Sequence, residues 1–286
     1  MANIILGYNN RVDAATLRDG TWSETLPQVN LQNRLVSKVA RTTTDSIAAA
    51  TINVDLGAAY AIGAVALIVH NISAAGLVRV RGNSATDMTS PLYDSGWVDV
   101  WPANAISVDL REWENDNFWT GTLTAAARAG FTVPFINLNP ARTVARYWRI
   151  EVDDTANADG YIQIGRLFIA DTWTPAINYS YGAGVFYEDP TQIATSVGGE
   201  EFFDQRTKFR IMRLRLAYMT EDEAYQQALE IQRLGGSSGE LIVMPDPDDL
   251  VNGFRRNFVG RLRSLSQVTI DPSGRFGVDL EIKELI

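Results

Sequence analysis

Apolar and polar residues alternate one by one along several stretches of the chain. In residues 147–153, Trp148, Ile150 and Val152 lie on one parity, with polar or charged residues on the other. Residues 52–56 and 77–81 follow the same period of two, which predicts β-strands with one buried face. Residues 64–70, AVALIVH, are nearly all apolar and suit a central strand. The first half of the chain is therefore predicted to be built from β-strands.

The pattern changes after Pro175, which we take as the boundary between two domains, residues 1–175 and 176–286. Residues 207–218 predict a long strand, in which the apolar residues change parity near residues 211–212 as they would at a β-bulge. Residues 193–201 are polar and predict a loop.

One helix is predicted over residues 221–234. Thr220 and Glu223 form a capping box at its start, and two glycines follow its end. Residues 258–270 and 275–285 then predict a hairpin, because the sequence between them, DPSG, is a strong turn signal. The second domain is therefore also mainly β, with one flanking helix.

Composition narrows the function classes. The chain has 286 residues, a net charge of −9 and a sequence pI near 4.7. Such a charge disfavours nucleic-acid binding that depends on counterion release. No apolar run reaches eighteen residues, and the N-terminus has no export signal, so we expect a protein made in the cytoplasm that does not insert into a membrane.

The residues that usually carry catalysis are scarce. The chain has no cysteine and one histidine, His70, which excludes the usual zinc sites and Cys- or Ser-His triads within one chain. No phosphate-binding loop occurs. Acidic residues near 153–160 and 246–249 suit Ca²⁺, but acidic turns are the favoured explanation. We therefore expect no enzyme activity and no cofactor or metal; a paired-acid glycosidase is left open by residue counts alone.

Residues 111–140 form an aromatic insertion between predicted strands. One interpretation is a packed flap over one end of the domain. The other is a platform for a ligand or partner, because aromatic faces stack on sugars and anchor interfaces. The candidate platform residues are Trp97, Trp101, Trp113 and Trp119.

The strand pair in residues 145–171, with the sequences ARYWRIEV and IGRLFIA, resembles the closing strands of discoidin-like (galactose-binding-like) β-sandwich domains. The strand LVRVRGNS at residues 77–84 extends the resemblance, which covers roughly residues 45–171. It implies a jelly-roll β-sandwich over residues 1–175. It also implies binding of sugars, lipid head groups or protein surfaces, and rarely catalysis.

Residues 176–286 resemble, in element order and terminal hairpin, the split β-barrel with a flanking helix of tail-tube and distal-tail proteins of long-tailed bacteriophages. Known distal-tail proteins usually place this barrel first, whereas here it comes second. The resemblance implies a structural virion protein of the tail or baseplate, assembled in the host cytoplasm. Such a protein forms a homo-oligomeric ring, with six subunits favoured over three, and contacts other tail proteins. DNA would pass through its lumen, which acidic residues such as Asp279 and Glu281 would line.

The alternative function is a carbohydrate-binding module that recognises glycans on the host surface. It rests on the discoidin resemblance and on the tryptophans. The two functions are compatible, since a tail protein can carry an adhesive domain.

Overall fold

The computed structural model describes residues 2–106, 108–115, 117–128, 131–132 and 135–286. It is mainly β, as the sequence predicts. The strands are β1 (Ile5–Tyr8), β2 (Thr16–Arg18), β3 (Ala40–Arg41), β4 (Ile52–His70), β5 (Leu77–Asn83), β6 (Tyr93–Asp99), β7 (Phe135–Asp153), β8 (Gln163–Trp173), β9 (Gly184–Glu188), β10 (Gln192–Thr195), β11 (Glu201–Asp204), β12 (Phe209–Met219), β13 (Leu241–Met244), β14 (Phe258–Leu262), β15 (Thr269–Ile270) and β16 (Phe276–Glu284). The helical segments are η1 (Arg11–Ala14), η2 (Gln28–Gln32), η3 (Val108–Leu110), α1 (Ala125–Arg128), η4 (Glu223–Ala228), α2 (Leu229–Gly235) and α3 (Gly253–Arg256).

The two longest strands, β4 and β7, bend around one core. Their antiparallel pairing shifts register between Asp55 and Tyr60 and again between Ile62 and Ala64. Such irregularities let a strand turn a corner and serve two layers. Side chains from both halves of β4 therefore reach the same hydrophobic core, Val54 from the first half and Leu67 from the second. This arrangement is consistent with a β-sandwich.

The predicted central strand at residues 64–70 is confirmed. This part of β4 lies between β7 and β8. Val65 and Leu67 point into the first core, whereas Ala66 and Ile68 pack on the other face against residues of β13 and β14. Burial on both faces explains why the sequence is apolar without alternation.

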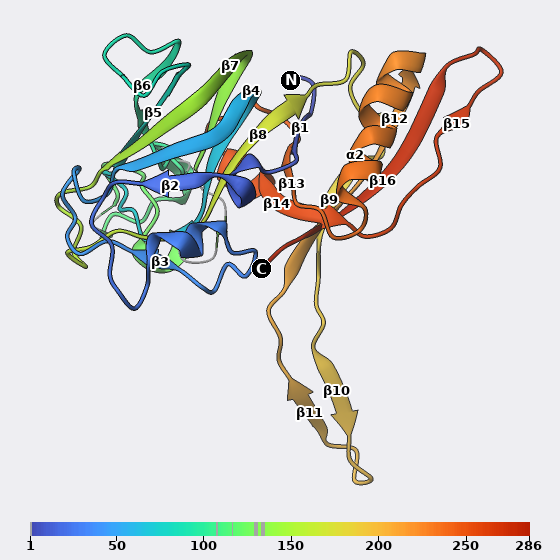
Figure 1. Cartoon of the computed structure of the whole chain (residues 1–286). Helices are drawn as coiled ribbons and strands as arrows, with labels where there is room; N and C mark the ends of the chain where they lie inside the picture. The colour runs from blue at the N-terminus through green and yellow to red at the C-terminus, as the bar shows by residue number, and fades with distance from the viewer. Residues whose placement is uncertain (1, 107, 116, 129–130, 133–134) are drawn as a thin grey trace.

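The second half extends the same sheet rather than standing apart from it. β1 pairs with β8 on one side and with β13 on the other, and the order continues through β14, β16 and β12 to β9 (Figure 1). Ile4 and Leu6 pack in the second core with residues of β12, β13 and β16. The N-terminal strand thus joins the two halves. The domain boundary at residue 175 and the split β-barrel stay predictions; in the described part of the single chain, β9 pairs only with β12 and leaves an open edge.

The expected β-bulge near residues 211–212 is wrong. β12 pairs with β16 without interruption from Ile211 to Leu216, and the register shift lies between Leu216 and Met219. Both Ile211 and Met212 are buried. The apolar residues change parity because the start of β12 is covered on both faces, and no residue is inserted there.

The capping box at the start of the second-half helix is confirmed. The Glu223 amide donates to the Thr220 hydroxyl (3.3 Å), and the Thr220 amide donates to the Glu223 carboxylate (3.0 Å). The helix continues as η4 and α2, and Ala224, Ala228 and Ile231 pack into the second core. Over the described residues, no helix combines the length and apolar character that a membrane span needs.

Candidate functional site

The four candidate platform tryptophans do not all reach the surface. Trp101 is only 5% exposed, its indole Nε1 donates to the Ile72 carbonyl (3.0 Å), and its ring meets Phe254 edge-on. The prediction that Trp101 offers a ligand platform is therefore wrong, because its polar atom and its ring faces are used inside the core. Trp97, on β6, is 40% exposed.

Trp113 and Trp119 lie together in the aromatic insertion. Their ring centroids are 5.6 Å apart, and Phe118 contacts both rings edge-to-face. Trp113 is 72% exposed and Trp119 is 77% exposed. Of residues 111–140, positions 116, 129, 130, 133 and 134 lie outside the described residues. The described part also packs on the first core, because Leu123 and Phe135 are buried in it and Phe131 lies against it, with Phe135 already in β7. The segment is therefore packed at one side, as a flap would be, and presents an exposed pair of tryptophan rings at the other.

His70 has a structural environment. Its Nδ1 accepts from the Ile72 amide (3.2 Å), which leaves the proton on Nε2, a buried atom without a hydrogen-bond partner. Part of the residue remains accessible, but the ring lies against Trp101. Burial, helped by the positive charge of Arg128, lowers the pKa of His70 to about 3. The imidazole is therefore neutral at physiological pH.

The acidic loop at residues 153–160 is held by internal hydrogen bonds. Asp154 accepts from the Ser73 amide and hydroxyl and from the Asn157 side chain, at 2.5–2.8 Å. Within the described ranges, no group of three or more His, Cys, Asp or Glu residues is placed to hold a metal ion. The favoured interpretation of an acidic turn fits these contacts.

Asp279 and Glu281, the candidate lumen residues, lie on the solvent-facing side of β16 among arginines. Glu281 accepts from Arg263 (2.7 Å) and Arg213 (3.2 Å). These arginines hold the pKa of Glu281 below its usual value, although burial acts in the opposite direction. The positive and negative charges on this face offset each other, so it is not strongly acidic in the single chain. Whether it lines a lumen stays a prediction.

A hairpin arm projects far from the body of the molecule (Figure 1). It consists of β10, β11 and the turn between them, and these two strands form a sheet of their own. The prediction of a loop over residues 193–201 is therefore correct only for residues 196–200, and wrong for 193–195 and 201, which lie in β10 and β11. The signal was present in the sequence: Ile193 on one side and Phe202 and Phe203 on the other flank a Gly-Gly turn, a hairpin pattern.

The arm exposes apolar side chains on both of its faces. Ile193 pairs with Phe203, and Ala194 pairs with Phe202, so the two pairs point to opposite sides. The exposed fractions are 59% for Ile193, 59% for Phe202 and 55% for Phe203. An isolated two-stranded hairpin is only marginally stable in water. A binding partner would remove this surface from water.

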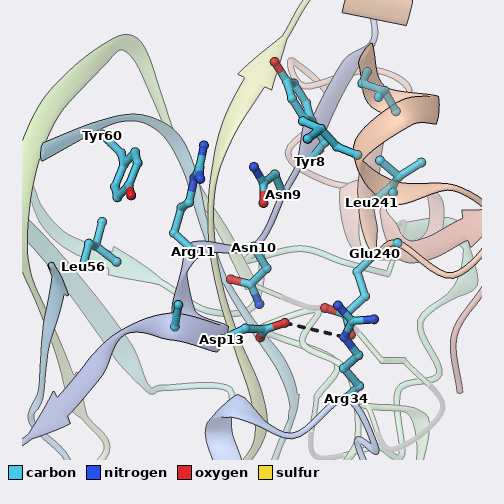
Figure 2. Close-up of a pocket in the computed structure, with 15 residues that line it drawn as sticks. Tyr8, Asn9, Asn10, Arg11, Asp13, Arg34, Leu56, Tyr60, Glu240 and Leu241 are labelled. Carbon is cyan, nitrogen blue, oxygen red and sulfur yellow. Dashed lines mark ion pairs between the residues drawn. The ribbon is translucent and has the colours of Figure 1, made fainter. Parts of the chain in front are cut away.

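A hollow of about 310 Å³ lies where the two halves meet (Figure 2). One wall comes from the segment that follows β1, the opposite wall from the end of α2 and the start of β13. The lining residues with polar groups include Tyr8, Asn9, Arg11, Asp13, Tyr60 and Glu240. Sequence reasoning missed this site, because its residues are spread over more than 230 positions and follow no local motif.

Beside the hollow lies a buried ion-pair cluster. Arg166, on β8, is fully buried; its Nε and Nη2 donate to the Glu240 carboxylate (2.9 and 2.5 Å), and Nη2 also donates to Asp13 (2.7 Å). Arg166 Nη1 is buried without a partner in the described part of the chain. Burial raises the pKa of Glu240, although Arg166 opposes this effect. The cluster ties the first half of the chain to the second.

No family model matches the chain, and no curated protein matches it. Among solved structures, the chain is similar to a mutant lectin-binding domain of lectinolysin in complex with Lewis b. That match has 13% identity and a TM-score of 0.36, and it covers 57% of this chain and 95% of that one.

Two further solved structures match at a similar level. One is CBM32-1 from a family 31 glycoside hydrolase of Clostridium perfringens, with 10% identity, a TM-score of 0.34, and coverage of 57% of this chain and 99% of that one. The other is an f-lectin from striped bass (Morone saxatilis) serum, with 9% identity, a TM-score of 0.36, and coverage of 96% and 92%. At these values the matches do not decide what this chain binds.

Proposed function

We propose that the chain is a structural subunit that assembles with copies of itself into a ring, as in the distal tail or baseplate of a long-tailed bacteriophage. The observation that carries the proposal is the hairpin arm, which extends apolar side chains away from the body on both faces. Fully burying one such side chain is worth about 1.5–3 kcal/mol. Burying the exposed part of Ile193, Phe202 and Phe203, 55–59% of each residue, would therefore favour docking of the arm against a neighbour.

The open edge of β9 supports the same proposal. β9 lies directly before the arm in the chain and pairs only with β12 among the described strands. Val185, Phe186 and Tyr187 on β9 are each at least 39% exposed. Unpaired edges with apolar side chains invite strand pairing between chains. A head-to-tail contact of this kind closes into a ring when its rotation allows. The ring would connect the tail tube to the tip or fibres.

Electron microscopy and light scattering on the purified chain test this proposal. We expect rings, with six subunits favoured over three, and a central hole wide enough for duplex DNA. Replacing Phe202 and Phe203 together by Ser should yield monomers that remain folded by circular dichroism. Leu250→Ser is the matched control, because Leu250 is 80% exposed but lies outside the arm. A monomeric wild-type chain, or rings that survive the arm double variant, would refute the proposal.

A second candidate function is glycan binding at the exposed aromatic cluster of Trp113, Phe118 and Trp119. Exposed aromatic faces stack on sugar rings, which makes this cluster suited to host-surface recognition. A glycan array with the whole chain, followed by titration with tryptophan fluorescence, tests it. Trp119→Ala should abolish the response while leaving assembly unchanged. A silent array would eliminate this function.

A further inference from the structure

The hollow between the two halves contains a guanidinium group that no carboxylate pairs with among the described residues. The lining carries the guanidinium groups of Arg11 and Arg34 and the carboxylates of Asp13 and Glu240, so the charges of the lining balance; the buried Arg166 pairs with both carboxylates from directly beside the hollow. A guanidinium without a carboxylate partner favours a negatively charged ligand.

Arg11 is the guanidinium without a carboxylate partner. Arg166 is paired with Glu240 and Asp13, and Arg34 lies 3.5 Å from Asp13. The Arg11 guanidinium instead lies 4.2 Å above the centre of the Tyr60 ring, and among the described residues no carboxylate lies within ion-pair distance of it. Stacking on a ring holds a guanidinium in place, and of its five N–H donors Asn9 engages two, one on each Nη atom, which leaves the others for an anion. Arg11 is therefore positioned to bind a carboxylate or phosphate.

The groups around Arg11 suit hydroxyls. When Asn9 accepts from Arg11 through its amide oxygen (3.2 and 3.3 Å), its amide NH₂ remains available as a donor. The Asp13 side chain is 32% exposed and offers an acceptor. The Tyr8 ring adds an apolar face to the wall, whereas the Tyr60 ring is covered by Arg11 (Figure 2). A few convergent polar groups and aromatic walls in a volume of roughly 300 Å³ or more are typical of small-molecule sites.

We propose that this hollow binds an acidic sugar of monosaccharide size, with its carboxylate or phosphate on Arg11 and its hydroxyls on Asn9 and Asp13. The hollow is formed within one chain and is distinct from the arm and from the exposed tryptophans. The site therefore does not depend on ring assembly.

Calorimetric titration of the whole chain tests the proposal. The probes are galacturonate and glucose 6-phosphate for the two anion types, galactose as the neutral sugar, and inorganic phosphate as the anion alone. We expect one or both acidic sugars to bind at least tenfold more tightly than galactose and phosphate, and binding to weaken with salt. Equal affinity for galactose, equal affinity for phosphate, or no binding of either acidic sugar would overturn the proposal.

Two variants locate the site. Arg11→Gln should weaken binding at least tenfold, whereas Arg275→Gln, which removes the same charge from an exposed turn, should not. Leu234→Trp should block binding by filling the hollow from the side of α2 with every charge intact. Unchanged affinity in both Arg11→Gln and Leu234→Trp would show that the sugar binds elsewhere. The Phe202/Phe203 double variant should bind normally, which separates this test from that of assembly.

Discussion

A buried ion pair near the end of the chain provides a sharp test of how the two halves are held together. Glu284, on β16, accepts from the Arg210 amide (2.8 Å), from Arg210 Nε (2.9 Å) and Nη2, and from the Thr132 hydroxyl (2.8 Å). The Arg210 and Glu284 side chains are 3% and 4% exposed. Thr132 belongs to the first half of the chain, so this carboxylate links both halves.

Glu284→Gln would leave the Arg210 charge buried without a counterion. Removing one partner of a buried pair costs about 3–5 kcal/mol. At about 2 °C per kcal/mol for a chain of this size, the melting temperature should fall by roughly 6–10 °C. Differential scanning calorimetry at pH 7 measures this change. The double variant Arg210→Met/Glu284→Leu should lose less stability than the sum of the losses in Arg210→Met alone and Glu284→Leu alone, since no unpaired charge remains in it.

Glu281→Gln is the matched control, three residues earlier on the same strand. Glu281 pairs with Arg213 and Arg263, but the three side chains are 26%, 62% and 42% exposed. Water and salt screen such pairs, so their loss costs about 0–1 kcal/mol. Equal, small decreases in melting temperature for Glu281→Gln and Glu284→Gln would refute the argument, because burial would then make no difference.

Three further predictions concern stability. The folded-state pKa of His70 is about 3, below its value in the unfolded chain, so the unfolded chain takes up more protons than the folded chain as the pH falls below 6.5. Relative to His70→Gln, the free energy of unfolding of the wild type should therefore fall by at most about 2 kcal/mol between pH 7 and pH 5, measured by urea denaturation. A difference between the two proteins that does not change with pH would contradict this. Gly20→Ala should lower the free energy of unfolding by about 2–4 kcal/mol, since φ is +74° and a Cβ would lie 2.6 Å from the Ala49 carbonyl oxygen. Gly160→Ala is the control: φ is +71° but no atom lies within 4 Å of the added Cβ, so the loss should be clearly smaller. Equal losses would show that the contact at Gly20 is irrelevant. Trp101→Phe should destabilise the chain by about 1–3 kcal/mol, because it leaves the Ile72 carbonyl without its donor, and an unchanged midpoint would place Trp101 outside the core.

The local elements of this protein follow from its sequence. The alternation in residues 147–153, the apolar run in residues 64–70 and the Thr220–Glu223 capping box each report an interaction between near neighbours. An alternating pattern arises in any strand with one buried face, and a capping box joins two residues that are only three positions apart. Such elements can be predicted from the sequence because the interactions that form them join residues only a few positions apart.

The sequence did not predict whether each aromatic residue is buried or exposed. Trp101 and Trp119 are equivalent as residue types, yet one donates to a carbonyl inside the core and the other is 77% exposed. The parity change near residues 211–212 was likewise ambiguous, because burial on both faces and a bulge produce the same sequence pattern. The pattern of apolar residues along a strand indicates which faces are buried, but not which other element packs on them.

Only the tertiary structure determined how the halves meet. β1 pairs with β13 across more than 230 residues, and this pairing creates both the continuous sheet and the hollow next to Arg11. Arg166 and Arg210 look like ordinary surface residues in the sequence, but each is buried against a carboxylate from a distant segment. A guanidinium is stable in the interior only when the fold delivers its counterion. The sequence by itself therefore determined the alternating and apolar strands of the first half and the helix cap, whereas long-range pairing determined the junction and its charges.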